Sequence, residues 1–208
     1  MLQFINIHTN QMEKIMNILQ SIALVSLTGS LLIAAPQSKK ELQMDEVVKL
    51  GKKGSSLLVQ TLGKNMKQHM KKGGEMDALN FCSNEAYDIT QNVNKKLPSG
   101  VNVKRVSAKY RSPANAPQEN ELAVLESFEK LQKLGVILPE YMIEKIDNKT
   151  FKYYKPLTIN NKVCLKCHGV LKDIDMKRAI AERYPLDKAL GYEMNDLRGA
   201  VVVTIQTK

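Results

Sequence analysis

Apolar residues recur at steps of three and four between positions 41 and 70, which is the spacing of one face of an α-helix. Gly51, Gly54 and Gly63 argue against an unbroken helix, because glycine has a low helix propensity. Gly73-Gly74 predicts the end of this helix and a turn. The apolar face is formed by Val47, Leu50, Gly54, Leu58, Leu62, Met66 and Met70.

A second helix is expected after the turn and as far as about Lys96, where Pro98-Ser99-Gly100 ends it. Because its apolar positions again fall on a single helix face, the pattern places Cys82 on the buried side. The stripe advances by three, four, three and four residues through Leu79, Cys82, Ala86, Ile89 and Val93.

The middle of the chain is expected to form shorter helices and strands than the N-terminal part. Val101 and Val103 alternate with polar residues and predict a strand over 101–109. Proline disfavours helix in the residue before it, so 112–117 is expected to be a loop. Pro117 is typical of the first turn of the helix that follows, which Gly135 closes.

The last third of the chain contains further strands. Two strands at 141–146 and 150–155 around Asp147-Asn148 predict a hairpin. A short helix is expected at 175–184 and a final strand at 199–206. Strands that pair locally, with helices that do not alternate strictly with them, indicate an α+β fold with an antiparallel sheet.

Positions 1–35 have the pattern of a targeting segment. Lys14 precedes an apolar run over 15–35, and Ala34-Ala35 is a plausible cleavage point before Pro36. The alternative is an uncleaved membrane anchor, since the run approaches the ~20 residues that span a bilayer. In both cases we expect the remaining chain, 40–208, to be one exported domain in the periplasm.

Charge and composition narrow the class of partner. The chain has 208 residues, a formal net charge of +10 and 43% hydrophobic residues, which is enough for one core. Its lysines are scattered, without a basic stripe interleaved with aromatics, and this argues against nucleic acid. An acidic redox partner protein suits the positive charge. Nothing in the sequence indicates the oligomeric state. Contact with a membrane is expected only through an uncleaved N-terminal segment.

The sharpest chemical signal is Cys164-Leu165-Lys166-Cys167-His168. Two thiols at this spacing can each add to one vinyl group of a haem, and the adjacent histidine can then ligate the iron. Cys82 is the third cysteine of the chain, and three are too few for a disulfide scaffold. We therefore expect one covalent haem c held by Cys164 and Cys167, with His168 as an iron ligand.

Three other interpretations of the cysteines remain. Cys164 and Cys167 have the spacing of a thioredoxin-like dithiol, although the βαβ context of such a motif is not evident. Together with Cys82 and His168 they would supply a Cys₃His zinc set, which adjacent Cys167 and His168 would strain. A plain disulfide is the third alternative.

The residues alone leave the second axial ligand open among Cys82, His69 and the methionines. A cysteine on an apolar helix face is usually an inert small hydrophobe, yet such a thiol is also well placed for a buried iron. His69 lies near a helix end amid lysines and is expected to be solvated. The methionines are expected to serve packing.

Four stretches of the chain carry one further signal: 78–86, 105–117 with Glu121, 164–169, and 184–192 with 196–200. Together they resemble a family of exported c-type haem domains with a PAS-like fold, long catalogued as a domain of unknown function. The resemblance extends from residue 43 to the C-terminus. Two positions depart from the family pattern: Ser112 stands where Asn commonly precedes Pro, and Asn195 stands where Gly commonly precedes Asp.

The resemblance implies that His168 and Cys82 are the axial pair. An iron with both axial positions filled has no open site for substrate, so we expect a non-enzymatic redox protein with a low-potential haem, because a thiolate stabilises Fe(III). The alternatives are a redox or gas sensor module and, less favoured, a peroxidase-type enzyme. Arg105 and Arg111 are candidates for the haem propionates, or for clamps on Glu121 or backbone.

Overall fold

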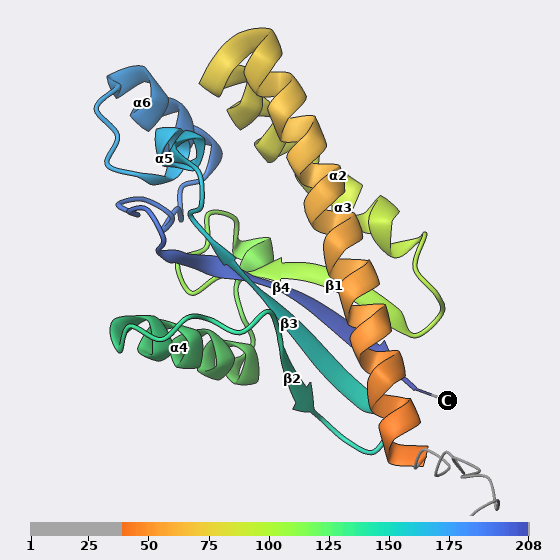
Figure 1. The fold of residues 1–208 in the computed structure, drawn as a ribbon. Helices are drawn as coiled ribbons and strands as arrows, with labels where there is room; N and C mark the ends of the chain where they lie inside the picture. Colours follow the sequence, from red (N-terminus) through yellow and green to blue (C-terminus); the bar gives the residue numbers. More distant parts are fainter. Residues whose placement is uncertain (1–38, 208) are drawn as a thin grey trace, which may run out of the picture. The chain divides into compact units, whose positions relative to one another are not determined.

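The computed structural model describes residues 39–207, so the targeting segment predicted at 1–35 lies outside the described residues. Within them, no helix has both the length and the apolar character needed to cross a membrane. Figure 1 shows the arrangement of the elements. The helices are α2 (Lys39–Asn84), α3 (Ala86–Asn94), the 3₁₀ turn η1 (Pro113–Asn115), α4 (Glu119–Lys133), α5 (Lys162–His168) and α6 (Ile174–Arg183), and the strands are β1 (Val101–Val106), β2 (Met142–Lys145), β3 (Thr150–Thr158) and β4 (Leu197–Gln206).

The strands form one antiparallel sheet in the order β1-β4-β3-β2. The last strand thus lies in the middle, with Val203 opposite Val103 on one side and Tyr153 on the other. The expected β2–β3 hairpin is confirmed, and β3 is longer than predicted. Helices with a fully antiparallel sheet confirm the α+β class.

Both faces of the sheet are covered, by α2 on one side and α4 on the other (Figure 1). Leu58 of α2 belongs to the same buried cluster as Tyr153 and Val203, whereas Phe128 of α4 packs with Val202 on the opposite face. Gly51, Gly54 and Gly63 do not interrupt α2, and the first two allow close packing against the sheet. A methyl group at Gly51 would lie 2.3 Å from the Tyr153 ring.

The turn predicted at Gly73-Gly74 is confirmed: Gly74 has φ +67°, and the helical path reverses there. The prediction that His69 is solvated is wrong, because its side chain contacts the second arm of the helix. Its Nδ1 lies 3.0 Å from Oδ2 of Asp77, and its ring stacks on Phe81 at 4.8 Å. His69 therefore fastens the two arms of α2 across the turn. The second predicted helix is also interrupted, at Glu85 between α2 and α3.

Helix α4 begins two residues later than Pro117, through a capping box between Gln118 and Glu121. Glu121 is fully buried and pairs with Lys104 at 2.9 Å and with Lys152 at 3.0 Å. Burial alone would raise the pKa of Glu121, but the Gln118 N–H and the two lysines lower it overall. Glu121 is thus paired with two lysines, so the alternative in which an arginine clamps Glu121 is wrong.

Gly199 of β4 should be intolerant of a side chain. Its φ is +148°, and a methyl group there would lie 2.2 Å from the Val106 carbonyl oxygen. We expect Gly199→Ala to lower the free energy of unfolding by roughly 3 kcal/mol, because strain and a backbone clash combine. In contrast, Gly63→Ala on α2 meets nothing within 4 Å and should gain about 1 kcal/mol from helix propensity. Urea unfolding of both variants measures the difference, and equal midpoints would contradict it.

Candidate cofactor site

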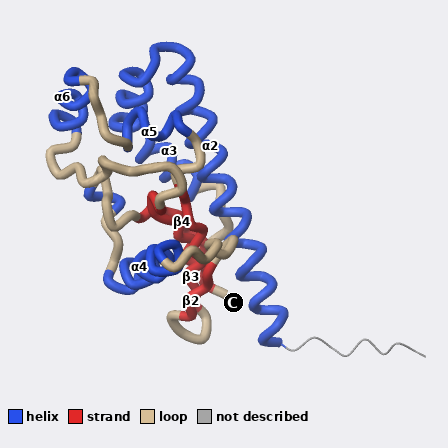
Figure 2. Tube along the Cα trace, turned by 60° about the vertical axis from the view of Figure 1, so that its left-hand side comes forward, coloured by secondary structure: helices blue, strands red, loops and turns tan. Residues whose placement is uncertain are grey.

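A cavity of about 570 Å³ lies among the second arm of α2, α3, β1 and α5. This volume falls in the roughly 300–1,000 Å³ range typical of cofactor and ligand sites. Figure 2 shows α5 beside α2 at the end of the molecule where the cavity lies. Among the described residues, the cavity wall holds three arginines and a lysine but no Asp or Glu: Lys104, Arg105, Arg111 and Arg198. The cavity therefore favours an anionic ligand.

The Cys-Leu-Lys-Cys-His motif lies in the short helix α5, which Asn161 caps because its side chain accepts from the Val163 N–H at 2.9 Å. Residues three and four positions apart share one helix face. Cys164, Cys167 and His168 have this spacing, and all three line the cavity. The helix thus presents both thiols and the imidazole to the same space.

His168 has one ring nitrogen engaged and one free for a ligand. Nδ1 lies 3.0 Å from the Ala189 carbonyl oxygen, which only accepts, so Nδ1 carries the proton. The lone pair is then on Nε2. Burial and the nearby charges of Arg198 and Arg111 lower the pKa of His168 to about 3, so the ring is neutral. A neutral imidazole with a fixed tautomer is the form that binds a metal.

Cys82 does not lie in the packed core, and the prediction that its stripe is buried is wrong at this position. Leu79 and Ala86 are buried at 1% and 3% exposure, whereas Cys82 is solvent-accessible and lines the cavity. The cavity admits small molecules, so the thiol is accessible although protein surrounds it. Removal from bulk water raises the pKa of Cys82, and Arg105 and Arg111 oppose this.

The structure brings Cys82, Cys164, Cys167 and His168 together around one cavity. It does not support the other interpretations of the cysteines. All three cysteines lie in the described part of the chain, and none forms a disulfide. Between residues 39 and 207, no group of three or more His, Cys, Asp or Glu side chains is arranged to hold a metal ion, which argues against the zinc set. The antiparallel sheet also lacks the βαβ context of a thioredoxin-like dithiol.

The two arginines singled out in the sequence have different surroundings. Nε of Arg105 is buried and has no hydrogen-bond partner within the described residues. Arg111 is engaged through Nε and Nη2: Nε pairs with Asp187 at 3.2 Å, and Nη2 donates to the carbonyl oxygens of Cys167 and Ala189. Arg105 is therefore the one suited to an anion in the cavity, and Arg111 is a backbone clamp.

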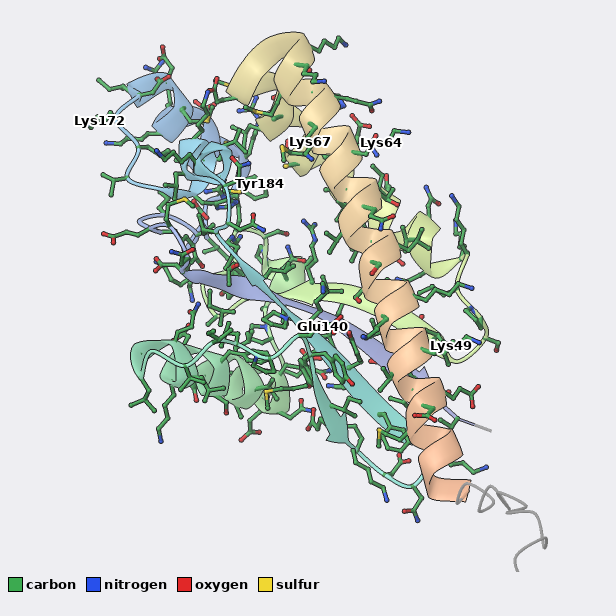
Figure 3. All side chains as sticks on the ribbon, viewed as in Figure 1. Lys49, Lys64, Lys67, Glu140, Lys172 and Tyr184 are labelled. Carbon is green, nitrogen blue, oxygen red and sulfur yellow. The ribbon has the colours of Figure 1, made fainter. Side chains whose placement is uncertain are left out.

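Other cavity residues were not assigned a role from the sequence. Burial and neighbouring Cys82 raise the pKa of Tyr184, labelled in Figure 3, to about 12, so its hydroxyl remains a donor. Met66 and Met70 also line the wall, in addition to their expected packing role. The distant stretch 184–200 carried no motif of its own, so only its resemblance to the family pointed to it.

The two departures from the family pattern are accommodated locally. Ser112 caps η1, where its side chain accepts from the Ala114 N–H. Asn195 has φ +72°, which is the left-handed region that glycine favours and asparagine tolerates. Both loops therefore have a backbone geometry that also suits the residues common in the family, Asn at position 112 and Gly at position 195.

Comparison with known proteins gives one family. A model of the Tll0287-like family matches residues 7–206. The crystal structure of the cyanobacterial heme-protein Tll0287 matches with a TM-score of 0.54 and 22% sequence identity, over 83% of this chain and 98% of that chain. At this identity, the likeness shows a shared fold. No curated protein matches.

Proposed function

The chain belongs to the Tll0287-like family, and from this premise and the cavity we propose that it is an exported protein with one covalent haem c that exchanges single electrons with a partner. One observation carries the proposal: Cys164, Cys167 and His168 face one cation-lined cavity, which they share with Cys82. The solved structure of similar fold is that of a heme-protein, which agrees with this assignment.

The residues of the cavity fit a haem. A haem combines an apolar ring with two carboxylates, and it supplies an iron that alternates between the ferric and ferrous states. Cys164 and Cys167 would hold the ring through thioether bonds. The unpartnered Nε of Arg105 would meet a propionate, because a guanidinium forms its strongest hydrogen bonds with carboxylates.

The axial ligands we propose are Nε2 of His168 and the thiolate of Cys82. The Ala189 carbonyl holds His168 in the tautomer that leaves Nε2 free. Arg105 and Arg111 favour the charged form of the Cys82 thiol against its desolvation. A thiolate stabilises Fe(III), so the reduction potential should be low. With both axial positions supplied by the protein, electron transfer is favoured over chemistry on a bound substrate.

Two features of the sequence support the proposed export and an acidic partner. Covalent haem attachment takes place outside the bacterial cytoplasm, and the N-terminal pattern at 1–35 agrees with export to the periplasm. The formal net charge of +10 favours an acidic redox partner, since opposite charges accelerate encounter. Such steering weakens as salt is added.

A sensor is the second candidate, and the turn in α2 favours it. Cys82 lies on the arm after Gly73-Gly74, whereas the preceding arm packs on the sheet. Displacement of Cys82 by CO or NO would free this arm from the cavity and would transmit the event across the turn to the preceding arm of α2. A peroxidase-type enzyme would require the same loss of Cys82 ligation.

Carbon monoxide separates these functions. We expect the spectrum of the dithionite-reduced protein to be unchanged within minutes of CO addition, because His168 and Cys82 occupy both axial positions. The Cys82→Ala variant is the matched control and should bind CO at once, because one position is then open. A rapid spectral shift in the unmodified protein would contradict electron transfer and would support sensing or catalysis.

A further inference from the structure

Arg111 joins three segments that are far apart in the sequence. Its side chain is 9% exposed, and its Nε donates to Oδ1 of Asp187, itself 7% exposed, at 3.2 Å. Its Nη2 donates to the Cys167 carbonyl oxygen at 2.6 Å and to the Ala189 carbonyl oxygen at 3.1 Å. One buried guanidinium thus joins the loop after β1 to the motif helix α5 and to the stretch after α6.

The contact with Cys167 completes the motif helix. The last four carbonyl groups of a helix have no partner inside it. Cys167 is the penultimate residue of α5, so its carbonyl oxygen needs an external donor. A positive charge at this end also stabilises the helix dipole. Arg111 therefore holds the end of α5 from which His168 projects.

The contact with Ala189 links Arg111 to His168 through a shared acceptor. The same carbonyl oxygen accepts from Nδ1 of His168 at 3.0 Å and from Arg111 at 3.1 Å. A carbonyl that bonds to a cation is a weaker acceptor for its second donor. The imidazole then acquires less negative character than it would from a free carbonyl, and a less basic imidazole donates less charge to a metal.

We propose that Arg111 is a positioning residue for the haem iron: it fixes His168 through the Cys167 and Ala189 carbonyls and keeps this ligand a moderate donor. This inference rests on the proposed function, because it concerns the potential of the bound haem. Asp187 sets the strength of the effect. Its Oδ1 also accepts from the Ala189 N–H at 2.8 Å, and its charge offsets part of the guanidinium charge.

Two substitutions should shift the reduction potential in opposite directions. In Arg111→Gln, the positive charge is lost and the Ala189 carbonyl becomes a stronger acceptor, so Fe(III) is favoured and the potential falls. In Asp187→Asn, the amide oxygen still accepts both hydrogen bonds, but the guanidinium charge is no longer offset, so the potential rises. Arg111→Lys retains the charge and should restore most of the potential lost in Arg111→Gln.

The test is a spectroelectrochemical titration of the haem-loaded full chain and of each variant, together with the ferric EPR spectrum. Arg178→Gln is the control, because Arg178 is 65% exposed on α6 and does not line the cavity. Its potential should equal that of the unmodified chain. A fall in Arg111→Gln with a rise in Asp187→Asn supports the inference.

Two outcomes overturn the inference. One is a haem-loaded Arg111→Gln variant with unchanged potential and EPR spectrum, and the other is a fall in potential for Asp187→Asn. Should Arg111→Gln not fold, the isosteric Asp187→Asn variant gives the decision alone. An unmodified chain that carries no haem would instead contradict the proposed function, so the two failures are distinct.

Discussion

A chain in which Cys164 and Cys167 are both replaced by serine is expected to retain no haem after denaturation. The two thiols lie on the cavity-facing side of α5, and each forms one thioether bond in the proposed attachment. Serine is close to cysteine in size, but its hydroxyl cannot form this bond. Haem staining of a denaturing gel, after expression with a cytochrome c maturation system, measures the loss directly.

The third cysteine provides the control. Cys82 lines the same cavity but lies outside the motif, so Cys82→Ser should stain like the unmodified chain. The single variants Cys164→Ser and Cys167→Ser retain one bond each and should stain more weakly. Staining that persists in the double variant would show that these cysteines do not attach the haem.

Replacing Cys82 with alanine should alter the ferric spectrum and raise the reduction potential. The thiolate is the ligand that favours Fe(III), and its removal leaves a neutral sixth position. Axial ligands spread haem potentials over about 0.8 V, so a rise on the order of 0.1 V is reasonable for the loss of one anionic ligand. Absorption spectra of the ferric protein and a potentiometric titration provide the two measurements.

A neighbouring substitution controls for local disturbance. Ser83 lies on the same helix, next to Cys82, and lines the same cavity. Because Ser83 is not one of the proposed iron ligands, Ser83→Ala should leave the spectrum and the potential unchanged. If the spectrum and the potential of Cys82→Ala are also unchanged, Cys82 is not the second axial ligand. Met66 and Met70, which line the cavity as well, would then be the next candidates.

Most of the secondary structure was predictable from local pattern. The hairpin around Asp147-Asn148 and the turn at Gly73-Gly74 depend on turn chemistry that is written into adjacent residues. The start of α4 was placed wrongly at Pro117, because the capping box of Gln118 and Glu121 decides the first turn. A buried carboxylate paired with two lysines from β1 and β3 cannot be inferred from the helix alone.

The sequence indicates which side chains line the cavity with the motif, but not the groups that support them. The motif identifies Cys164, Cys167 and His168 by spacing, because positions three and four apart share a helix face. The sequence singles out Cys82 but places it in the packed core, whereas the residue lies on the cavity wall, since hydrophobic periodicity does not distinguish the two. The Ala189 carbonyl that orients His168 is a backbone group, and no side chain in the sequence indicates it.

The most direct measurement is the intact mass of the mature, denatured polypeptide, recorded with its absorption spectrum. The proposal predicts the mass of the amino-acid chain plus one haem, with the haem absorption retained by the unfolded chain. A colourless polypeptide that has only the mass of its amino acids would contradict it, because the cavity thiols would then hold no haem.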